Sequence, residues 1–323
     1  MTSRSTACAA FLTMLTASAT LSAQSRPPAT QPAGVADPVW RTRHTLYGTL
    51  DRRIRECSGI VASRRHPGIY WALSDSGNTA DLFAIHDTGD AVGVWTVEGV
   101  RNVDWEAIAI DDHGRILIGD IGDNECKRRD TRLLIVAEPA QPEASGRLPV
   151  QDAIDVRYPE GPRNAEALFA CGGELLVIEK SLGLFGSAAA ILYSVKSIGP
   201  ATQQSAADNQ PSPSLRALEK FTFAGPVTAA DQSRDGRRLA VSTYTSLYVF
   251  KRPDAAGRFL TESPFVMPML CGQVEGIAFH HDGSGDILLT NEQRSVYRVP
   301  RRWYESERAY VPGAILKNTA EQR

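Results

Sequence analysis

Acidic side chains recur along this chain at one kind of position, at the start of a short apolar segment. Carboxylates that a fold brings together can hold a metal ion or exchange protons with a substrate. Four copies of the pattern occur, at residues 56–60 (ECSGI), 104–108 (DWEAI), 164–168 (NAEAL) and 273–277 (QVEGI). A degenerate fifth copy lies in the remaining gap, at residues 226–230 (PVTAA).

The spacing of these copies predicts a repeat architecture. Equivalent positions are separated by roughly 45 to 60 residues, the period of a β-propeller blade rather than of a helical or leucine-rich repeat. The positions taken as equivalent are Ser58, Glu106, Glu166, Thr228 and Glu275. We therefore predict an all-β propeller of five four-stranded blades, with six blades as the alternative.

Each copy is followed by the other parts of a blade. A Gly-containing turn comes after the first apolar run, because Gly accepts the positive φ that tight turns need. A second apolar run then ends in a polar residue, and these residues are Asp75, Asp120, Lys180, Thr243 and Asn291. The start of a first strand and the end of a second lie at the same end of such a blade. The polar residues should therefore gather at one end of the ring.

The strand that completes the last blade is predicted to come from the N-terminal side. Candidate fourth strands are residues 92–97, 153–158 and 218–223, but after Pro300 the chain is charged and rich in turns. The segment from His44 to Leu50 is a strand without a partner in the first blade. Pairing it with the last blade would close the ring and remove an open sheet edge.

The acidic residues expected at this end of the ring form a candidate metal site. Two like charges about 4 Å apart repel by about 4 kcal/mol at an effective dielectric of about 20, so a counter-charge is needed. Ca²⁺ suits a set of carboxylates and amides without clustered Cys or His. The predicted ligands are Glu56, Asp104, Glu106, Asp120, Asp123, Glu166 and Glu275. The alternative is that individual acids accept backbone N–H bonds or pair with arginines.

Two Gly-containing segments are the most specific local motifs at this end. Residues 119–124 (GDIGDN) can turn tightly and present carboxylates and an amide from one loop, as metal loops do. Residues 75–78 (DSGN) are the counterpart in the first blade, although this sequence is also typical of an Asx turn. The ligand-binding positions expected on the same face are Asp75, Asn78, Asn124, Thr243, Tyr244, Asn291 and Glu292.

The first residues have the features of a secretory signal. Arg4 precedes an apolar stretch from Ala7 to Leu21 that is too short to span a bilayer, and residues 21–23 (LSA) resemble a signal-peptidase site. We expect a signal peptide (1–23), a disordered lead-in (24–42), the propeller (43–300) and a tail that packs on the propeller or leaves it (301–323). The mature chain should be exported, periplasmic or secreted, without a membrane span; an uncleaved anchor is the alternative.

Export makes the cysteines informative. Cys57, Cys126, Cys171 and Cys271 remain after the leader and allow three complete pairings. Cys57 and Cys271 each precede a first strand, in blades that ring closure makes neighbours, so we predict a Cys57–Cys271 disulfide at the seam. Cys126 and Cys171 are expected at opposite faces and unpaired, and four buried free thiols are the alternative.

The motifs ECSGI, DSGN, DWEAIA and GDIGDN together resemble a group of uncharacterised exported bacterial β-propeller proteins. The chain is more distantly similar to the SdiA-regulated and phytase-esterase-like propellers. The resemblance extends from Glu56 to about Val299 and implies a propeller with a calcium site. The fourth copy departs from the acidic pattern, because Thr228 stands where other copies have Glu.

Two classes of function are consistent with these residues. The net charge of −2 gives no electrostatic reason for nucleic acid or anionic lipid as a partner. No nucleophile elbow, phosphate loop or His-Glu-x-x-His motif occurs, and His280 and His281 are expected to be solvated turn residues. The first class is a monomeric propeller whose Ca²⁺-ordered central face binds a small molecule, glycan, peptide or protein. The alternative is a metal-dependent hydrolase of phosphoesters, esters or lactones, with Glu106 or Glu166 as general base and Lys180 stabilising negative charge.

Overall fold

The regular secondary structure of the described residues is almost entirely β-strand. The computed structural model describes residues 43–181, 187–195, 214–252, 259–260 and 263–305. The predicted signal peptide and lead-in, and the end of the predicted tail, lie outside the described residues. Twenty strands and one short helix occur in the described ranges. The all-β class predicted from the sequence is confirmed.

The strands follow one another in antiparallel groups of four. The first group is β2 (Cys57–Ala62), β3 (Ile69–Ser74), β4 (Asp81–His86) and β5 (Ala91–Glu98). The second is β6 (Trp105–Ile110), β7 (Arg115–Asp120), β8 (Arg132–Ala137) and β9 (Gly146–Asp155). The third is β10 (Ala165–Cys171), β11 (Glu174–Glu179), β12 (Ser187–Val195) and β13 (Leu215–Ala224). The fourth is β14 (Val227–Gln232), β15 (Arg238–Thr243), β16 (Ser246–Lys251) and β17 (Phe265–Pro268).

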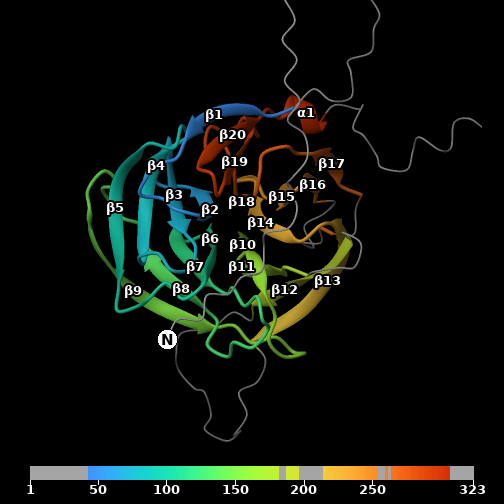
Figure 1. Cartoon of the computed structure of the whole chain (residues 1–323), viewed down its shortest axis with the longest axis horizontal. Coiled ribbons are helices and arrows are strands. Elements are labelled where there is room, and N and C mark those ends of the chain that lie inside the picture. Colours follow the sequence, from blue (N-terminus) through green and yellow to red (C-terminus); the bar gives the residue numbers. More distant parts are fainter. Residues whose placement is uncertain (1–42, 182–186, 196–213, 253–258, 261–262, 306–323) are drawn as a thin grey trace, which may run out of the picture. The chain divides into compact units, whose positions relative to one another are not determined.

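The last group takes its outer strand from the other end of the described chain. It contains β18 (Val274–Phe279), β19 (Ile287–Asn291) and β20 (Ser295–Val299), and β1 (Thr45–Thr49) pairs antiparallel with β20. Figure 1 shows the blue β1 lying along the red β20. The sequence prediction that this N-terminal segment completes the last sheet is confirmed.

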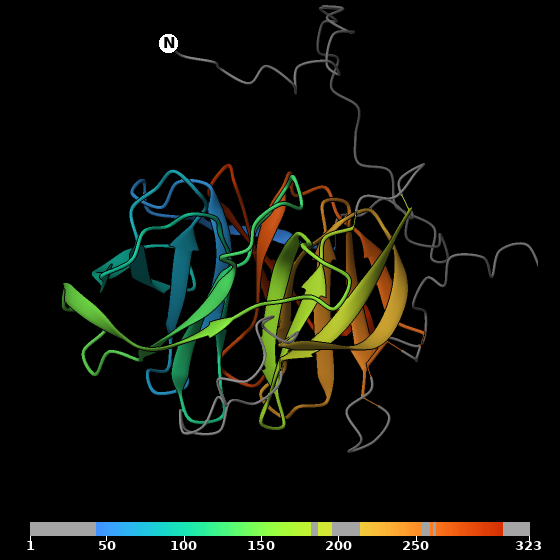
Figure 2. The same cartoon turned by 90° about the horizontal axis from the view of Figure 1, so that it is seen from below.

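The first strands of the groups form a closed ring. β2, β6, β10, β14 and β18 contact one another in succession, and β18 contacts β2 (Figure 1). Apolar side chains fill the space between neighbouring groups, so the described residues form a hydrophobic cluster at each junction. At the closing junction, Ile60 and Tyr70 of the first group pack with Leu288 and Val296 of the last. Figure 2 shows the connecting loops at two opposite ends of the strands.

The outer strands differ from the prediction in two groups. β9 begins at Gly146, well before the predicted segment 153–158, because its first half leaves its own group and pairs in parallel with β5 from Trp95 to Glu98. This pairing joins the first two groups into one sheet of eight strands. The fourth group, for which no outer strand was predicted, has β17.

The predicted Cys57–Cys271 disulfide is wrong. All four cysteines after the leader are free thiols, and Cys57 and Cys271 are both buried. The Cys57 Sγ atom lies 3.5 Å from Thr290 Oγ1, so the side chain points toward β19 rather than toward the segment that precedes β18. Ring closure thus makes the two strands neighbours without bringing the sulfur atoms together.

The described part of the C-terminal tail packs on the fourth group. α1 (Arg302–Glu305) contacts β17, and the buried Tyr304 lies beside Phe265 with ring centroids 6.3 Å apart. The Tyr304 hydroxyl donates to the carbonyl of Gly285. No helix within the described ranges has the length and apolar character needed to cross a membrane.

Candidate functional site

Every first strand begins with a β-bulge, and the bulge falls on the recurring position found in the sequence. Where a first strand pairs with the second strand of its group, one residue of the first strand has no partner in the ladder. These unpaired residues are Ser58, Glu106, Glu166, Thr228 and Glu275. A bulge leaves its extra residue outside the ladder and redirects the side chain. The repeat in the sequence is therefore a repeat of this backbone feature, and Ser58, Glu106 and Glu166 line one small central cavity.

Three carboxylates converge beside the bulge of β6. Asp75 follows the end of β3, Asp104 precedes β6 and Glu106 is the bulged residue. One carboxylate oxygen from each lies within 4.8 Å of the others. Glu106 is buried, whereas Asp75 and Asp104 are partly exposed. The cluster thus has one deep acid and two acids nearer to solvent.

Asn102, which the sequence did not single out, holds the two parts of this cluster together. Its side-chain amide donates to the carbonyl oxygens of Ser74 and Asp75, both at 2.8 Å. Its side-chain oxygen accepts from the backbone N–H of Trp105 at 3.0 Å. The end of β3 is thereby fixed to the start of β6. A lone Asn in a loop has no sequence signal for such a role, because both partners are backbone groups distant along the chain.

The loop of residues 119–124 forms a wall behind the cluster. The backbone N–H of Gly122 donates to the Asp104 carbonyl at 3.1 Å. A Cβ atom at Gly122 would lie 2.4 Å from the Asp104 carboxyl carbon and 2.7 Å from Glu106 Cγ. Gly is required here by close approach, so the backbone of this motif shapes the site.

The acidic side chains of the same loop have protein partners instead. Asp120 is fully buried and accepts from Arg128 Nη2 at 2.9 Å and from the Asp104 backbone N–H at 3.2 Å. The Asp123 carboxylate accepts the backbone N–H groups of Lys127 and Arg128 at 2.9 and 2.8 Å. Asp120 thus pairs with an arginine and Asp123 accepts backbone N–H bonds, as the alternative to metal binding expected. Neither carboxylate is part of the three-acid cluster.

Burial and mutual repulsion act on the three clustered carboxyls. Burial raises the pKa of Asp75 to about 6, and the charges of Asp104 and Glu56 add to the rise. The pKa of Glu106 is raised well above its ordinary value. Burial is the largest cause, and the negative charges of Glu166 and Asp75 are the next largest. The charge of Lys180 opposes this rise, but it ranks below burial and the three neighbouring carboxylates. Glu106 is thus a buried acid surrounded mainly by like charges.

Glu166 lies next to the cluster and has one occupied and one free oxygen. Its Oε1 atom pairs with the ammonium of Lys180, which also donates to the Tyr244 hydroxyl at 2.9 Å. Its buried Oε2 atom has no hydrogen-bond partner among the described residues. Burial raises the pKa of Glu166 to about 7, although Lys180 opposes the rise. The sequence prediction that places Glu166 and Lys180 together agrees with this ion pair.

Glu275 extends the acidic surface toward the last group. Burial, followed by the charges of Glu166 and Glu292, raises the pKa of Glu275 to about 8. Glu292 accepts from Gln273 Nε2 at 3.0 Å, and Asn78 Nδ2 lies 3.5 Å from a Glu56 carboxylate oxygen. These residues surround the cluster without joining its three oxygens.

The remaining predicted ligand-binding residues make hydrogen bonds within the protein. Thr243 Oγ1 accepts the Ser246 N–H at 3.1 Å. Asn291 donates to the Cys271 carbonyl at 2.5 Å and accepts the Ser295 N–H at 2.7 Å. Asn124 accepts from Asn164 Nδ2 at 3.1 Å. Thr243 and Asn291 thus hold backbone segments, and Asn124 holds the Asn164 side chain, so all three contribute to the shape of this end of the ring.

An open groove lies next to the cluster. Its volume is about 690 Å³, and its lining includes Ser76 and Asn78, which follow Asp75 in the chain. Arg52, Arg55 and Arg294 also line this groove. A molecule in it would meet both positive and negative side chains.

Comparison with known proteins assigns no family. No family model matches the chain. The search of curated proteins finds no match either. The geometry of the acidic cluster is therefore the basis for assigning a function.

Proposed function

We propose that this protein is an exported five-bladed β-propeller that binds a divalent cation, Ca²⁺ in the first place, at its acidic central face. The observation that carries the proposal is the convergence of Asp75, Asp104 and Glu106. The bound cation would order this face for a small-molecule, glycan, peptide or protein ligand. The sequence resemblance to exported bacterial propellers supports the same reading.

The arrangement of strands supports the propeller. Five groups of four strands, counted with β1 in the last, surround a closed ring of first strands. Each group packs on the next through its own hydrophobic cluster. A propeller is the architecture in which radial repetition leaves no long open edge.

The distances in the cluster suit a calcium ion. Ca–O distances of about 2.3–2.6 Å allow two ligand oxygens on one ion to lie up to about 5 Å apart. The oxygens of Asp75, Asp104 and Glu106 meet this limit, since they lie within 4.8 Å of one another. The like charges around the buried Glu106 carboxyl are a second indication, because a bound cation would compensate the repulsion that raises its pKa.

The groove beside the cluster supports a binding function. A ligand in the space lined by Ser76, Asn78 and Arg294 would approach the open side of the cluster at Asp75. Ca²⁺ takes six to eight oxygen ligands, so three carboxylates leave positions for water or for oxygens of the ligand. Polyhydroxylated and anionic ligands both offer such oxygens.

Hydrolysis of phosphoesters, esters or lactones is a second candidate, favoured by one observation. Glu166 combines a free buried oxygen with a pKa of about 7, which is the range of a general base at neutral pH. Lys180 is held against it and would stabilise negative charge on a substrate. A bound cation would supply polarisation of the electrophile.

Calorimetric titration with CaCl₂ tests the proposal. The wild-type chain should bind Ca²⁺, and Glu106→Gln should weaken binding by at least about tenfold, since tenfold corresponds to only about 1.4 kcal/mol. Glu138→Gln is a matched control, because Glu138 is also a buried glutamate but accepts from Trp71 Nε1 at 2.9 Å. Equal binding by wild type and Glu106→Gln, or no binding by wild type, would contradict the metal site.

A phosphatase, esterase and lactonase screen of the calcium-loaded protein tests the second candidate. Glu166→Gln should abolish any activity while leaving calcium binding within a few fold. Activity that survives this substitution would exclude Glu166 as the base.

A further inference from the structure

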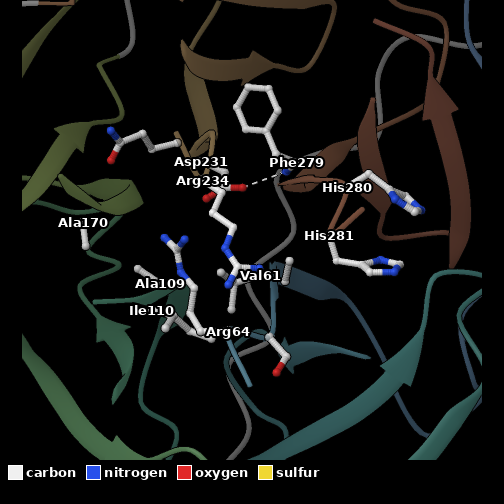
Figure 3. Close-up of a pocket in the computed structure, with 13 residues that line it drawn as sticks. Val61, Arg64, Ala109, Ile110, Ala170, Asp231, Arg234, Phe279, His280 and His281 are labelled. Atoms are coloured by element: carbon white, nitrogen blue, oxygen red, sulfur yellow. Dashed lines mark hydrogen bonds between the residues drawn. The ribbon is translucent and has the colours of Figure 1, made fainter. Parts of the chain in front are cut away.

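The opposite end of the same first strands opens into a second pocket. Its walls are apolar side chains near the ends of these strands and polar side chains from the loops that follow them (Figure 3). The apolar part includes Val61, Ala109, Ile110, Ala170 and Phe279, all of them buried. None of the acids of the candidate metal site lines this pocket.

Two arginines from different groups project into this pocket. Arg64 belongs to the loop between β2 and β3, and Arg234 to the loop between β14 and β15. Figure 3 shows both side chains extending across the opening. Arg64 is partly buried and Arg234 is exposed. Within the described residues, neither guanidinium forms an ion pair with a carboxylate.

The other polar groups of the pocket are already engaged. His280 lies 3.2 Å from an Asp87 oxygen and 3.0 Å from an Asp282 oxygen, and it is buried rather than solvated as the sequence suggested. His281 Nδ1 lies 3.1 Å from the Tyr70 hydroxyl. These contacts leave the histidines held in place at one side of the pocket.

The one carboxylate that faces the arginines is committed to the backbone. Asp231 accepts the Phe279 N–H at 2.7 Å, and Figure 3 draws this bond beside Arg234. Burial raises the pKa of Asp231 to about 6, while the charge of Arg64 opposes the rise. A single carboxylate cannot balance two guanidiniums, so the lining carries an excess of positive charge.

We propose that Arg64 and Arg234 form a binding site for a small oxyanion, either a carboxylate or a phosphate group. Guanidinium groups offer paired N–H donors whose geometry matches such anions. The cavity of about 40 Å³ exceeds the roughly 10–15 Å³ that one water needs, so it accommodates a group of a few heavy atoms.

The site is independent of the proposed calcium centre. Its lining residues come from the far ends of the first strands, and its ligand has the opposite charge. The pocket lies on a protein surface made by loops, so an anion reaches it without passing the acidic cluster. The oxyanion site can therefore be confirmed or excluded without any result on the metal site.

Thermal melts of the full chain in sodium phosphate or sodium acetate test the site. EDTA is present throughout so that no cation takes part, and sodium chloride keeps the ionic strength constant. A ligand that binds the folded state raises the melting temperature in proportion to the logarithm of its concentration above saturation. We expect such a rise with at least one of the two probes.

For Arg64→Gln and for Arg234→Gln, the probe concentration needed for a given rise in melting temperature should be about tenfold higher than for the wild type. This is the effect of losing a charge-assisted hydrogen bond. Arg65→Gln and Arg237→Gln are matched controls, because these exposed arginines belong to the same two loops but do not line the pocket. Arg64→Lys, which keeps the charge but loses the paired donors, should give an intermediate result.

The two probes separate the possible sources of the oxyanion. A response to phosphate alone indicates a phosphorylated ligand, and a response to acetate alone indicates a carboxylate. A response to both supports an oxyanion site of broad specificity. A wild type without a saturable response, or pocket variants that respond as the loop controls do, would overturn the proposal.

Discussion

The two ends of the first strands carry charges of opposite sign, and they hold them in different ways. At one end the acids Glu106, Glu166 and Glu275 are buried residues of backbone bulges, and their pKa values are raised. At the other end Arg64 and Arg234 belong to loops and reach solvent. The repeated bulge therefore sets where the side chains of the acidic end lie, although two of its five positions are Ser58 and Thr228, whereas the basic end depends on individual loop residues.

This difference has a consequence for mutation. A bulge is part of the sheet, so any change that moves it alters the packing of neighbouring strands as well as the site. A loop arginine can be replaced with little effect on the fold, because surface substitutions usually change the free energy of unfolding by less than about 0.5 kcal/mol. Variants at the acidic end should therefore affect stability and binding together, and variants at the basic end should affect binding alone.

The largest effect is expected for Gly122→Ala. The added methyl group would lie 2.4 Å from the Asp104 carboxyl carbon, so the loop or the carboxylates must move. We expect a loss of about 1–3 kcal/mol in the free energy of unfolding, as for other overpacked sites, and a loss of calcium binding. Urea unfolding and calcium titration measure the two effects.

Gly119→Ala is the control for this prediction, because the atoms nearest to its Cβ would be side-chain atoms of Ile121 and Ala107 at 3.1 to 3.3 Å, with no closer contact. It should retain calcium binding. If Gly122→Ala binds calcium as well as Gly119→Ala does, the 119–124 loop does not shape the site.

A smaller effect is expected from pH in the metal-free protein. The folded-state pKa values of Asp75, Glu166 and Glu275, about 6, 7 and 8, lie above those of the unfolded chain. These three groups therefore bind more protons in the folded state than in the unfolded state, so their contribution to stability should rise as the pH falls from about 8 to about 6, while the lowered pKa values of His44 and His281 oppose it near pH 6. Each group contributes at most about 1.4 kcal/mol per pH unit.

Calcium should reverse this trend, because protons compete with the cation for the same oxygens. Melting temperatures with EDTA and with saturating calcium, measured across this pH range, give both slopes. Glu106→Gln should show a shallower slope without metal than Glu138→Gln does. A metal-free slope of the opposite sign would mean that these carboxyls are stabilised as anions by the fold.

The smallest effect is expected at the basic end, for Asp231→Asn. The substitution removes the negative charge that faces Arg64 and Arg234, while the amide oxygen can still accept the Phe279 N–H. Affinity for the oxyanion probe should increase by about two- to fivefold, which corresponds to less than about 1 kcal/mol. Phosphate or acetate titrations followed by melting temperature measure the change, and weaker binding would show that Asp231 helps to build the pocket.

The sequence predicted the repeating elements well because their signals are local. Alternating turns and apolar runs placed the first and second strands, and the position shared by Ser58, Glu106, Glu166, Thr228 and Glu275 proved to be the bulge in every first strand. The closing strand at residues 44–50 was also predicted, since a strand without a partner in its own group needs one elsewhere.

The disulfide prediction failed because it required knowledge of side-chain direction, and the same knowledge is needed to tell one acid from another. Cys57 and Cys271 lie at neighbouring strands, but Cys57 turns toward Thr290. Asp120 has the same residue type as Asp75 and stands at the end of an equivalent strand, yet Arg128 neutralises it. The local sequence does not predict which acid an arginine will pair with, because the pairing depends on the path by which a loop returns to the sheet.

By itself, then, the sequence determined that this chain is all-β, that its elements repeat, and that acids recur at the starts of its first strands. Only the tertiary structure decided that the carboxylates of Asp75, Asp104 and Glu106 converge, and that Arg64 and Arg234 line one pocket. The physical reason is the range of the interactions. Strands and turns follow from neighbours in the chain, whereas a site follows from residues of different groups that meet only after the ring has closed.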